Sequence, residues 1–87
     1  MIDEIIDKYS DSVLNNISRE NMKKIINFLK KENCDFIEDI IEDYLDLFTF
    51  EYEEFVDKYN KLNTKYNNNL LELASSDMNI LEEFYTI

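Results

Sequence analysis

The 87-residue chain carries 20 acidic and 9 basic side chains, a formal net charge of −11, and 45% of its residues are hydrophobic. This length suits one small domain, and the hydrophobic content is too high for a disordered chain. A negative charge of this size repels nucleic acid and anionic membranes, so we expect the chain to bind neither of them directly.

Glycine and proline are both absent from the chain. Their absence favours helices joined by short connections containing Asn or Ser over β-hairpins, whose tight turns usually need glycine. We therefore expect an all-α fold, a small bundle of four to five amphipathic helices, built as a single domain over residues 1–87. Apolar residues at three- and four-residue steps predict a first helix that begins near Ile2 and ends near Asn15–Asn16.

Ser18 is the expected N-cap of a second helix, because its hydroxyl can accept a hydrogen bond from a free N–H of the first turn. Lys30 and Lys31 fall in the last turn of that helix, where positive charge is favourable. Asn33 follows, and we expect it to adopt the left-handed conformation that commonly ends a helix.

A third helix is predicted to open on a capping box, with Asp35 as the cap and Glu38 three residues later. Acidic and apolar residues sort onto opposite sides of this helix at about 100° per residue. A fourth helix, capped by Thr49, carries an apolar stripe from Tyr52 to Tyr66 that stays in phase with the third. One unbroken helix over residues 36–66 would be about 46 Å long, so we prefer a bend or break at Phe48–Phe50.

Asn67–Asn69 is the clearest turn signal of the chain. Asn69 and Glu72 repeat the capping-box spacing, which predicts a short helix over residues 70–74. A last apolar stripe, from Met78 to Tyr85, predicts a C-terminal helix that closes over the core.

Catalysis and cofactor binding find little support in the residue types. Cys34 is the only cysteine and there is no histidine, so an internal disulfide and a structural zinc site are excluded, and the thiol has no imidazole to activate it. Phosphate-binding loops and EF-hand calcium loops need glycine. We expect a protein that is not an enzyme and uses no cofactor and no metal, with weak divalent-cation binding to carboxylates as a minor alternative.

The stretch from Glu32 to Asp57 holds eleven acidic residues and no basic one. Its carboxylates over Asp35–Asp46 lie about 3 Å apart along a helix, close to the charge spacing along one DNA strand. We predict that an acidic face binds a partner, and define it as Asp35, Glu38, Asp39, Glu42, Asp43, Asp46, Glu53, Glu54 and Asp57.

Such a face suits a basic protein surface, for example the groove in which an enzyme holds nucleic acid. The sequence thus favours a small acidic protein-binding module that mimics nucleic acid and inhibits a nucleic-acid-binding enzyme or defence complex. In type, though in no motif, it resembles phage-encoded inhibitors of bacterial nucleases. The alternatives are an ordinary solvated face and a homo-oligomeric module that pairs with itself as a homodimer. The N-terminus lacks the pattern of a secretory signal and no apolar run is long enough to span a membrane, so we expect a cytoplasmic protein.

Overall fold

The computed structural model describes residues 17–87 and confirms the all-α class. Within these residues there is no strand, and the predicted first helix, near residues 2–16, lies outside them. Residues 17–87 contain α-helices and two 3-10 helices, the latter labelled η1 and η2. In chain order the elements are α2 (Arg19–Lys31), α3 (Ile37–Asp43), η1 (Leu45–Thr49), α4 (Tyr52–Lys65), α5 (Leu70–Ser76) and η2 (Met78–Tyr85).

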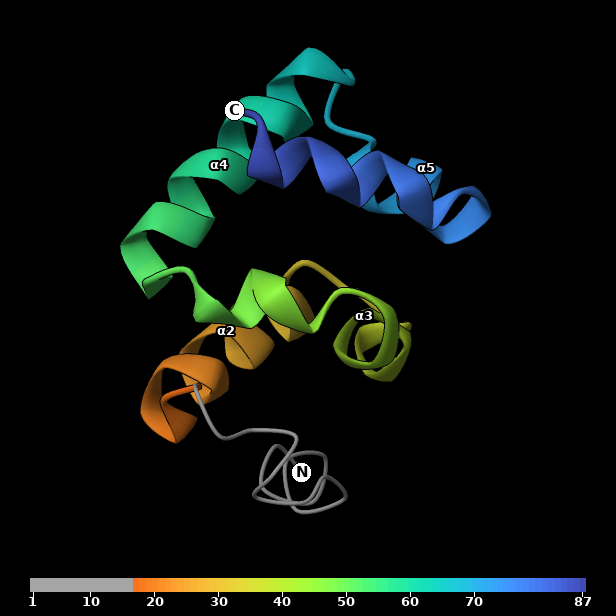
Figure 1. Ribbon diagram of the computed structural model, residues 1–87. Helices are drawn as coiled ribbons and strands as arrows, with labels where there is room; N and C mark the ends of the chain where they lie inside the picture. The colour runs from red at the N-terminus through yellow and green to blue at the C-terminus, as the bar shows by residue number, and fades with distance from the viewer. Residues whose placement is uncertain (1–16) are drawn as a thin grey trace. The chain divides into compact units, whose positions relative to one another are not determined.

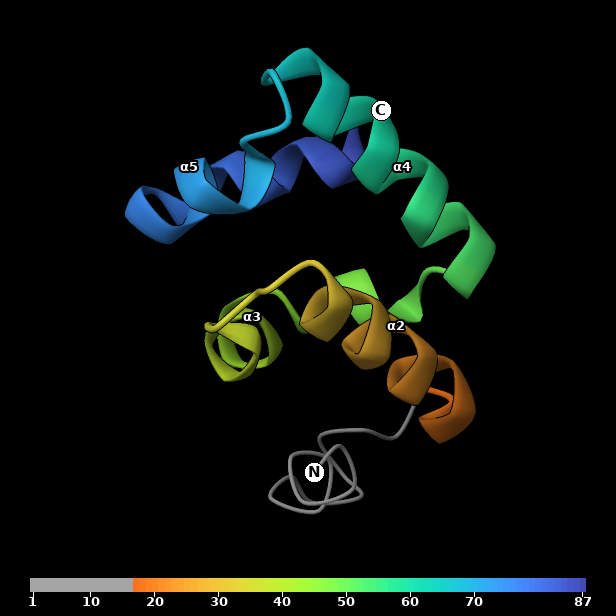
Figure 2. The same cartoon turned by 180° about the vertical axis from the view of Figure 1, so that it is seen from behind.

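The chain divides into two compact units, one ending at Tyr52 and one formed by Glu53–Ile87. In the first unit η1 packs against both α2 and α3 (Figure 1). In the second, α5 lies beside η2, as the views from both sides show (Figure 2). The single domain over residues 1–87 stays a prediction. No helix within residues 17–87 has the length and apolar character needed to cross a membrane.

Both units contain buried apolar side chains, and within residues 17–87 no polar or charged side chain is fully buried. In the first unit the core consists of Met22, Ile25, Ile26, Leu29, Cys34, Ile37, Ile40, Ile41, Leu47 and Phe48. In the second it consists of Phe55, Tyr59, Leu62, Leu70, Ala74, Leu81 and Phe84, with the rings of Phe55 and Phe84 stacked at 5.1 Å.

α2 has the boundaries that its local sequence predicts. The Ser18 hydroxyl accepts a hydrogen bond from the Asn21 N–H at 3.2 Å, and Lys30 and Lys31 occupy the last turn. Asn33 has a φ of 64°, as expected for a left-handed helix end. The N–H groups of Asn33 and Cys34 donate back to Lys30 and Leu29 at 3.0 Å, which is the hydrogen-bond pattern of a Schellman motif.

A second Schellman motif ends α4. Asn67 has a φ of 59°, its N–H donates to the Thr64 carbonyl at 3.2 Å, and the Asn68 N–H donates to the Asn63 carbonyl at 2.7 Å. In a chain without glycine, asparagine thus supplies the left-handed residue at both helix ends. The predicted turn at Asn67–Asn69 is confirmed.

Both capping boxes, however, are wrong. α3 begins one residue later than predicted, with Phe36 as its N-cap, and no side chain caps it. Asn69 holds the N-cap position of α5, but its side chain makes no capping hydrogen bond either. The first N–H of the helix, that of Leu70, donates to the Oδ1 atom of Asn63 at 3.1 Å. Each box matched the spacing of a capping motif, but the spacing does not ensure that the side chain turns back onto the backbone.

The predicted break near Phe48–Phe50 is confirmed, while the predicted cap on its far side is wrong. Phe50 is extended, with φ −66° and ψ 145°, and separates η1 from α4. Thr49 does not cap α4, because α4 begins three residues later at Tyr52. Its hydroxyl instead donates to the Asp46 carbonyl at 2.6 Å. The N–H of Tyr52 at the start of α4 is satisfied by the Asn21 Oδ1 atom of α2, at 2.8 Å.

Candidate functional site

The carboxylates from Asp35 to Asp46 are not carried by one helix, contrary to the sequence interpretation. α3 ends at Asp43 because Tyr44, with φ −136° and ψ 47°, leaves the helical conformation. Asp35 therefore precedes α3, and Asp46 lies in the first turn of η1. The even spacing of charges from Asp35 to Asp46 along a helix of about 18 Å does not exist in this structure.

α3 itself shows the predicted sorting of side chains. Ile37, Ile40 and Ile41 are buried. The carboxylates occupy the other positions of the helix: Asp39, Glu42 and Asp43 are exposed and Glu38 is half-buried. Among residues 17–87, none of the exposed acids Asp39, Glu42, Asp43 and Asp46 forms an ion pair.

α3 carries negative charge at its C-terminal end, where negative charge is unfavourable for a helix. Glu42 and Asp43 occupy the last turn, which contains no basic residue. The unpaired carbonyls of that turn already make the C-terminal end negative, so each carboxylate there is unfavourable by some tenths of a kcal/mol. Asp39 adds repulsion of like charge at three and four residues' distance, at a similar cost per pair. Stability alone does not account for this arrangement.

The remaining acidic residues belong to the second unit. Glu53 and Glu54 are exposed in the first turn of α4, where negative charge is favourable. Asp57 follows and pairs with Lys61 at 3.1 Å, although both side chains are about 60% exposed. Such an exposed pair contributes little to stability, but it places a positive charge beside one predicted binding residue.

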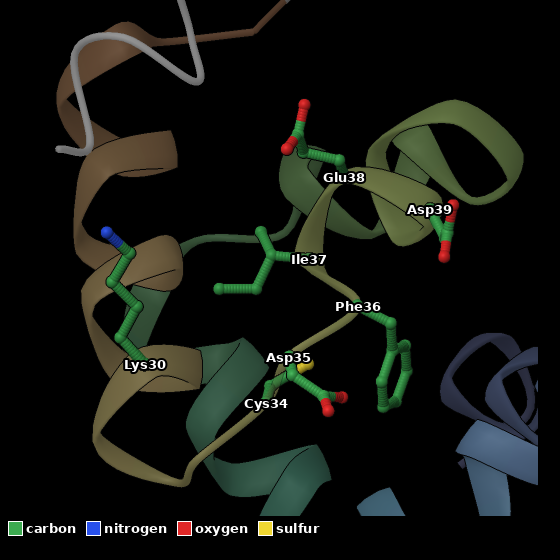
Figure 3. Close-up of a pocket in the computed structure, with 7 residues that line it drawn as sticks. All are labelled: Lys30, Cys34, Asp35, Phe36, Ile37, Glu38 and Asp39. Atoms are coloured by element: carbon green, nitrogen blue, oxygen red, sulfur yellow. The ribbon is translucent and has the colours of Figure 1, made fainter.

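A shallow hollow of about 360 Å³ lies beside the start of α3 (Figure 3). Lys30 of α2 and Glu38 and Asp39 of α3 line it, together with the connecting residues 34–36. In the close-up the carboxylates of Glu38 and Asp39 point in different directions, so they do not converge on a point that an ion could occupy. Throughout residues 17–87, no group of three or more acidic or cysteine side chains is placed to hold a metal ion.

Cys34 lines the same hollow, and its residue is only 8% exposed. Burial raises the pKa of its thiol, and the negative charge of Asp35 raises that pKa further, while a hydrogen bond from the Phe36 N–H opposes them. A raised pKa lowers the fraction of thiolate, which is the reactive form. The environment of Cys34 is therefore that of a core residue.

The chemistry open to this surface is that of exposed carboxylates, which accept hydrogen bonds from Lys and Arg side chains and attract positive charge. The structure brings Glu38, Asp39, Glu42 and Asp43 together on α3 and leaves Glu53, Glu54 and Asp57 as a separate group on α4. Comparisons with protein-family models, with curated proteins and with solved structures find no match.

Proposed function

We propose that the protein is an acidic protein-binding module whose α3–η1 carboxylates bind a basic protein surface. The partner is the nucleic-acid-binding face of an enzyme or defence complex, and the module inhibits it by taking the place of nucleic acid. The observation that supports the proposal is the run of exposed carboxylates without ion pairs at the C-terminal end of α3.

The unfavourable position of these charges is the physical argument for a partner. A face that serves solubility alone usually mixes both signs, which allows ion pairs along the helix. At the end of α3, repulsion among carboxylates and with the helix carbonyls remains uncompensated within the described residues. Lys and Arg side chains of a partner would relieve both, so the free protein gives up some stability in exchange for binding.

A pair of double charge reversals tests the proposal. Glu42→Lys/Asp43→Lys removes two acids from the end of α3, and Glu72→Lys/Glu82→Lys removes two equally exposed acids from the second unit. Both changes shift the net charge by the same amount, so a difference between them reports the effect of the α3 surface rather than of the total charge. We expect the α3 variant to lose its partner and the control to keep it.

The measurement is capture of a partner from an extract of the source cells at low and at high salt, followed by its release with duplex DNA. Binding that steers opposite charges together weakens with salt, and a partner bound through its nucleic-acid site is released by DNA. Equal capture by both variants would refute the proposal, as would a partner that DNA does not release. Circular dichroism of both variants checks that helicity survives.

A second candidate, self-association as a homodimer, is favoured by a different observation. Leu73, Tyr85 and Ile87 of the second unit are 42%, 45% and 41% exposed. Apolar contacts of this kind are not weakened by salt, so a dimer made by them should persist in sedimentation at 1 M NaCl. A monomer at every salt and protein concentration would exclude this candidate.

A further inference from the structure

The side chain of Asn21 in α2 takes the place of a helical hydrogen bond between η1 and α4. In an α-helix the N–H of Tyr52 would donate to the carbonyl of Phe48, four residues earlier. Instead, the Asn21 Oδ1 atom accepts the Tyr52 N–H at 2.8 Å, and the Nδ2 atom donates to the Phe48 carbonyl at 3.4 Å. The same Nδ2 atom donates to the Phe50 carbonyl at 2.6 Å.

The sequence of the junction lacks the two residue types that most often break a helix. Residues 45–65 include no glycine and no proline. Large apolar side chains continue across the junction in alternating steps of four and three residues, at Phe48, Tyr52, Phe55, Tyr59 and Leu62. Helices break at proline or glycine, or where a side chain enters the ladder of backbone hydrogen bonds, and only the last of these causes is present here.

We infer that Asn21 is a conformational clasp, and that release of its amide lets η1 and α4 join into one continuous α-helix over residues 45–65. The two forms differ over residues 45–51, where the 3-10 helix η1 and the extended Phe50 turn into α-helix. In the joined helix the Phe48 carbonyl and the Tyr52 N–H bond to each other, so neither group loses its partner when Asn21 leaves. The clasped form keeps the ring of Tyr52 edge-on to Phe28 of α2, with the ring centroids 6.5 Å apart.

The joined helix would also rearrange the acidic residues, and the importance of this change for binding rests on the proposed function. Glu53 and Asp57 follow Asp46 by seven and eleven residues. In one continuous helix the three side chains would therefore lie within about 40° of one another around the helix axis. Release of Asn21 would assemble these three acids into a single row. The clasp itself does not depend on that function, because it is tested by backbone conformation without any partner.

Asn21→Ala removes all the clasping hydrogen bonds, and Asn27→Ala, an exposed position on the same helix, is the matched control. By nuclear magnetic resonance we expect the Cα chemical shift of Phe50 to move from extended to helical in Asn21→Ala only. A new cross-peak should join the Phe48 Hα and the Tyr52 amide proton. A Phe50 that stays extended, or an η1 that loses its helical signals altogether, would overturn the inference.

A second pair of variants decides the question even if Asn21→Ala does not fold. Thr49→Ala raises helix propensity at the junction and removes the hydroxyl that donates to the Asp46 carbonyl in the clasped form. Thr64→Ala makes the same change of propensity inside α4, which is helical in both forms. With Asn21 in place, Thr49→Ala should increase the population of the joined helix up to about threefold, seen as a partial helical shift at Phe50. The same shift in both variants, or in neither, would contradict the clasp.

Discussion

Replacement of Asn33 tests whether asparagine does the work of glycine at the end of α2. Asn33 has a φ of 64° and an exposed side chain. In Asn33→Ala the backbone must hold the same left-handed conformation, but alanine lacks the short polar side chain that makes this conformation less costly for asparagine. Asn27→Ala is the control, because Asn27 is an exposed residue in the middle of the same helix.

The two substitutions are expected to change stability in opposite directions. A left-handed conformation costs a residue with a Cβ atom about 1–2 kcal/mol, of which asparagine recovers a part, so Asn33→Ala should lose about 1 kcal/mol. Inside the helix alanine is favoured over asparagine by about 0.6 kcal/mol, so Asn27→Ala should gain that amount. For a chain of this size the difference of about 1.6 kcal/mol separates the two melting temperatures by about 6–12 °C.

Thermal unfolding followed by circular dichroism at 222 nm measures this difference, and Asn33→Gly completes the set. Glycine has no Cβ atom, so the Gly variant should melt close to the unmodified protein. Equal losses in Asn33→Gly and Asn33→Ala would show that the amide side chain, rather than the backbone angle, stabilises this end. A shift of the same sign for both alanine variants would refute the reasoning.

Other groups of the second unit and of the core give further predictions. Hydrogen bonds from Lys65 and Tyr66 lower the pKa of Glu83, so its contribution to stability is present above the usual value of 4.5 and is lost as pH falls through the lowered value. The free energy of unfolding should therefore fall less steeply with acid in Glu83→Gln than in the unmodified protein. Because burial raises the pKa of Cys34, its thiol should react with Ellman's reagent more slowly than free cysteine at pH 7.5, and at the normal rate in 6 M guanidinium. Phe84→Ala should cost about 3–5 kcal/mol in urea unfolding, since the ring is buried and stacked.

Features set by neighbouring residues could be predicted from the sequence. The Ser18 cap and the left-handed Asn33 each depend on at most six consecutive residues, and both are present. The sorting of acids and isoleucines along α3 also follows from helical spacing alone. The hydrogen bonds of both features are made inside such a window. A short window alone is not enough, because the capping boxes at Asp35 and Asn69 span only four residues and are wrong.

Features set from a distance could not be predicted in the same way. The N–H at the start of α4 is satisfied by Asn21, 31 residues away, whereas the local sequence favours Thr49 as the cap. The end of α3 at Tyr44 was missed for a related reason: acids and apolar residues keep their helical phase through Asp46 and Phe48. Periodicity reports which side of a helix is buried, but it does not report where tertiary contacts divide the helix. The predicted helix over Asp35–Asp46 is therefore wrong, while binding by its acidic residues stays a prediction.

The contacts of Asn21 have a consequence for how this sequence tolerates change. Its amide binds only main-chain groups of Phe48, Phe50 and Tyr52. Substitution of the side chain at position 50 leaves those main-chain groups in place, so this position should tolerate any side chain that the packing accommodates. Position 21 needs a donor and an acceptor on one short side chain, and Asp lacks the donor while Leu lacks both. The break between η1 and α4 thus depends on a residue of α2. A mutational scan should find position 21 more sensitive to substitution than position 50.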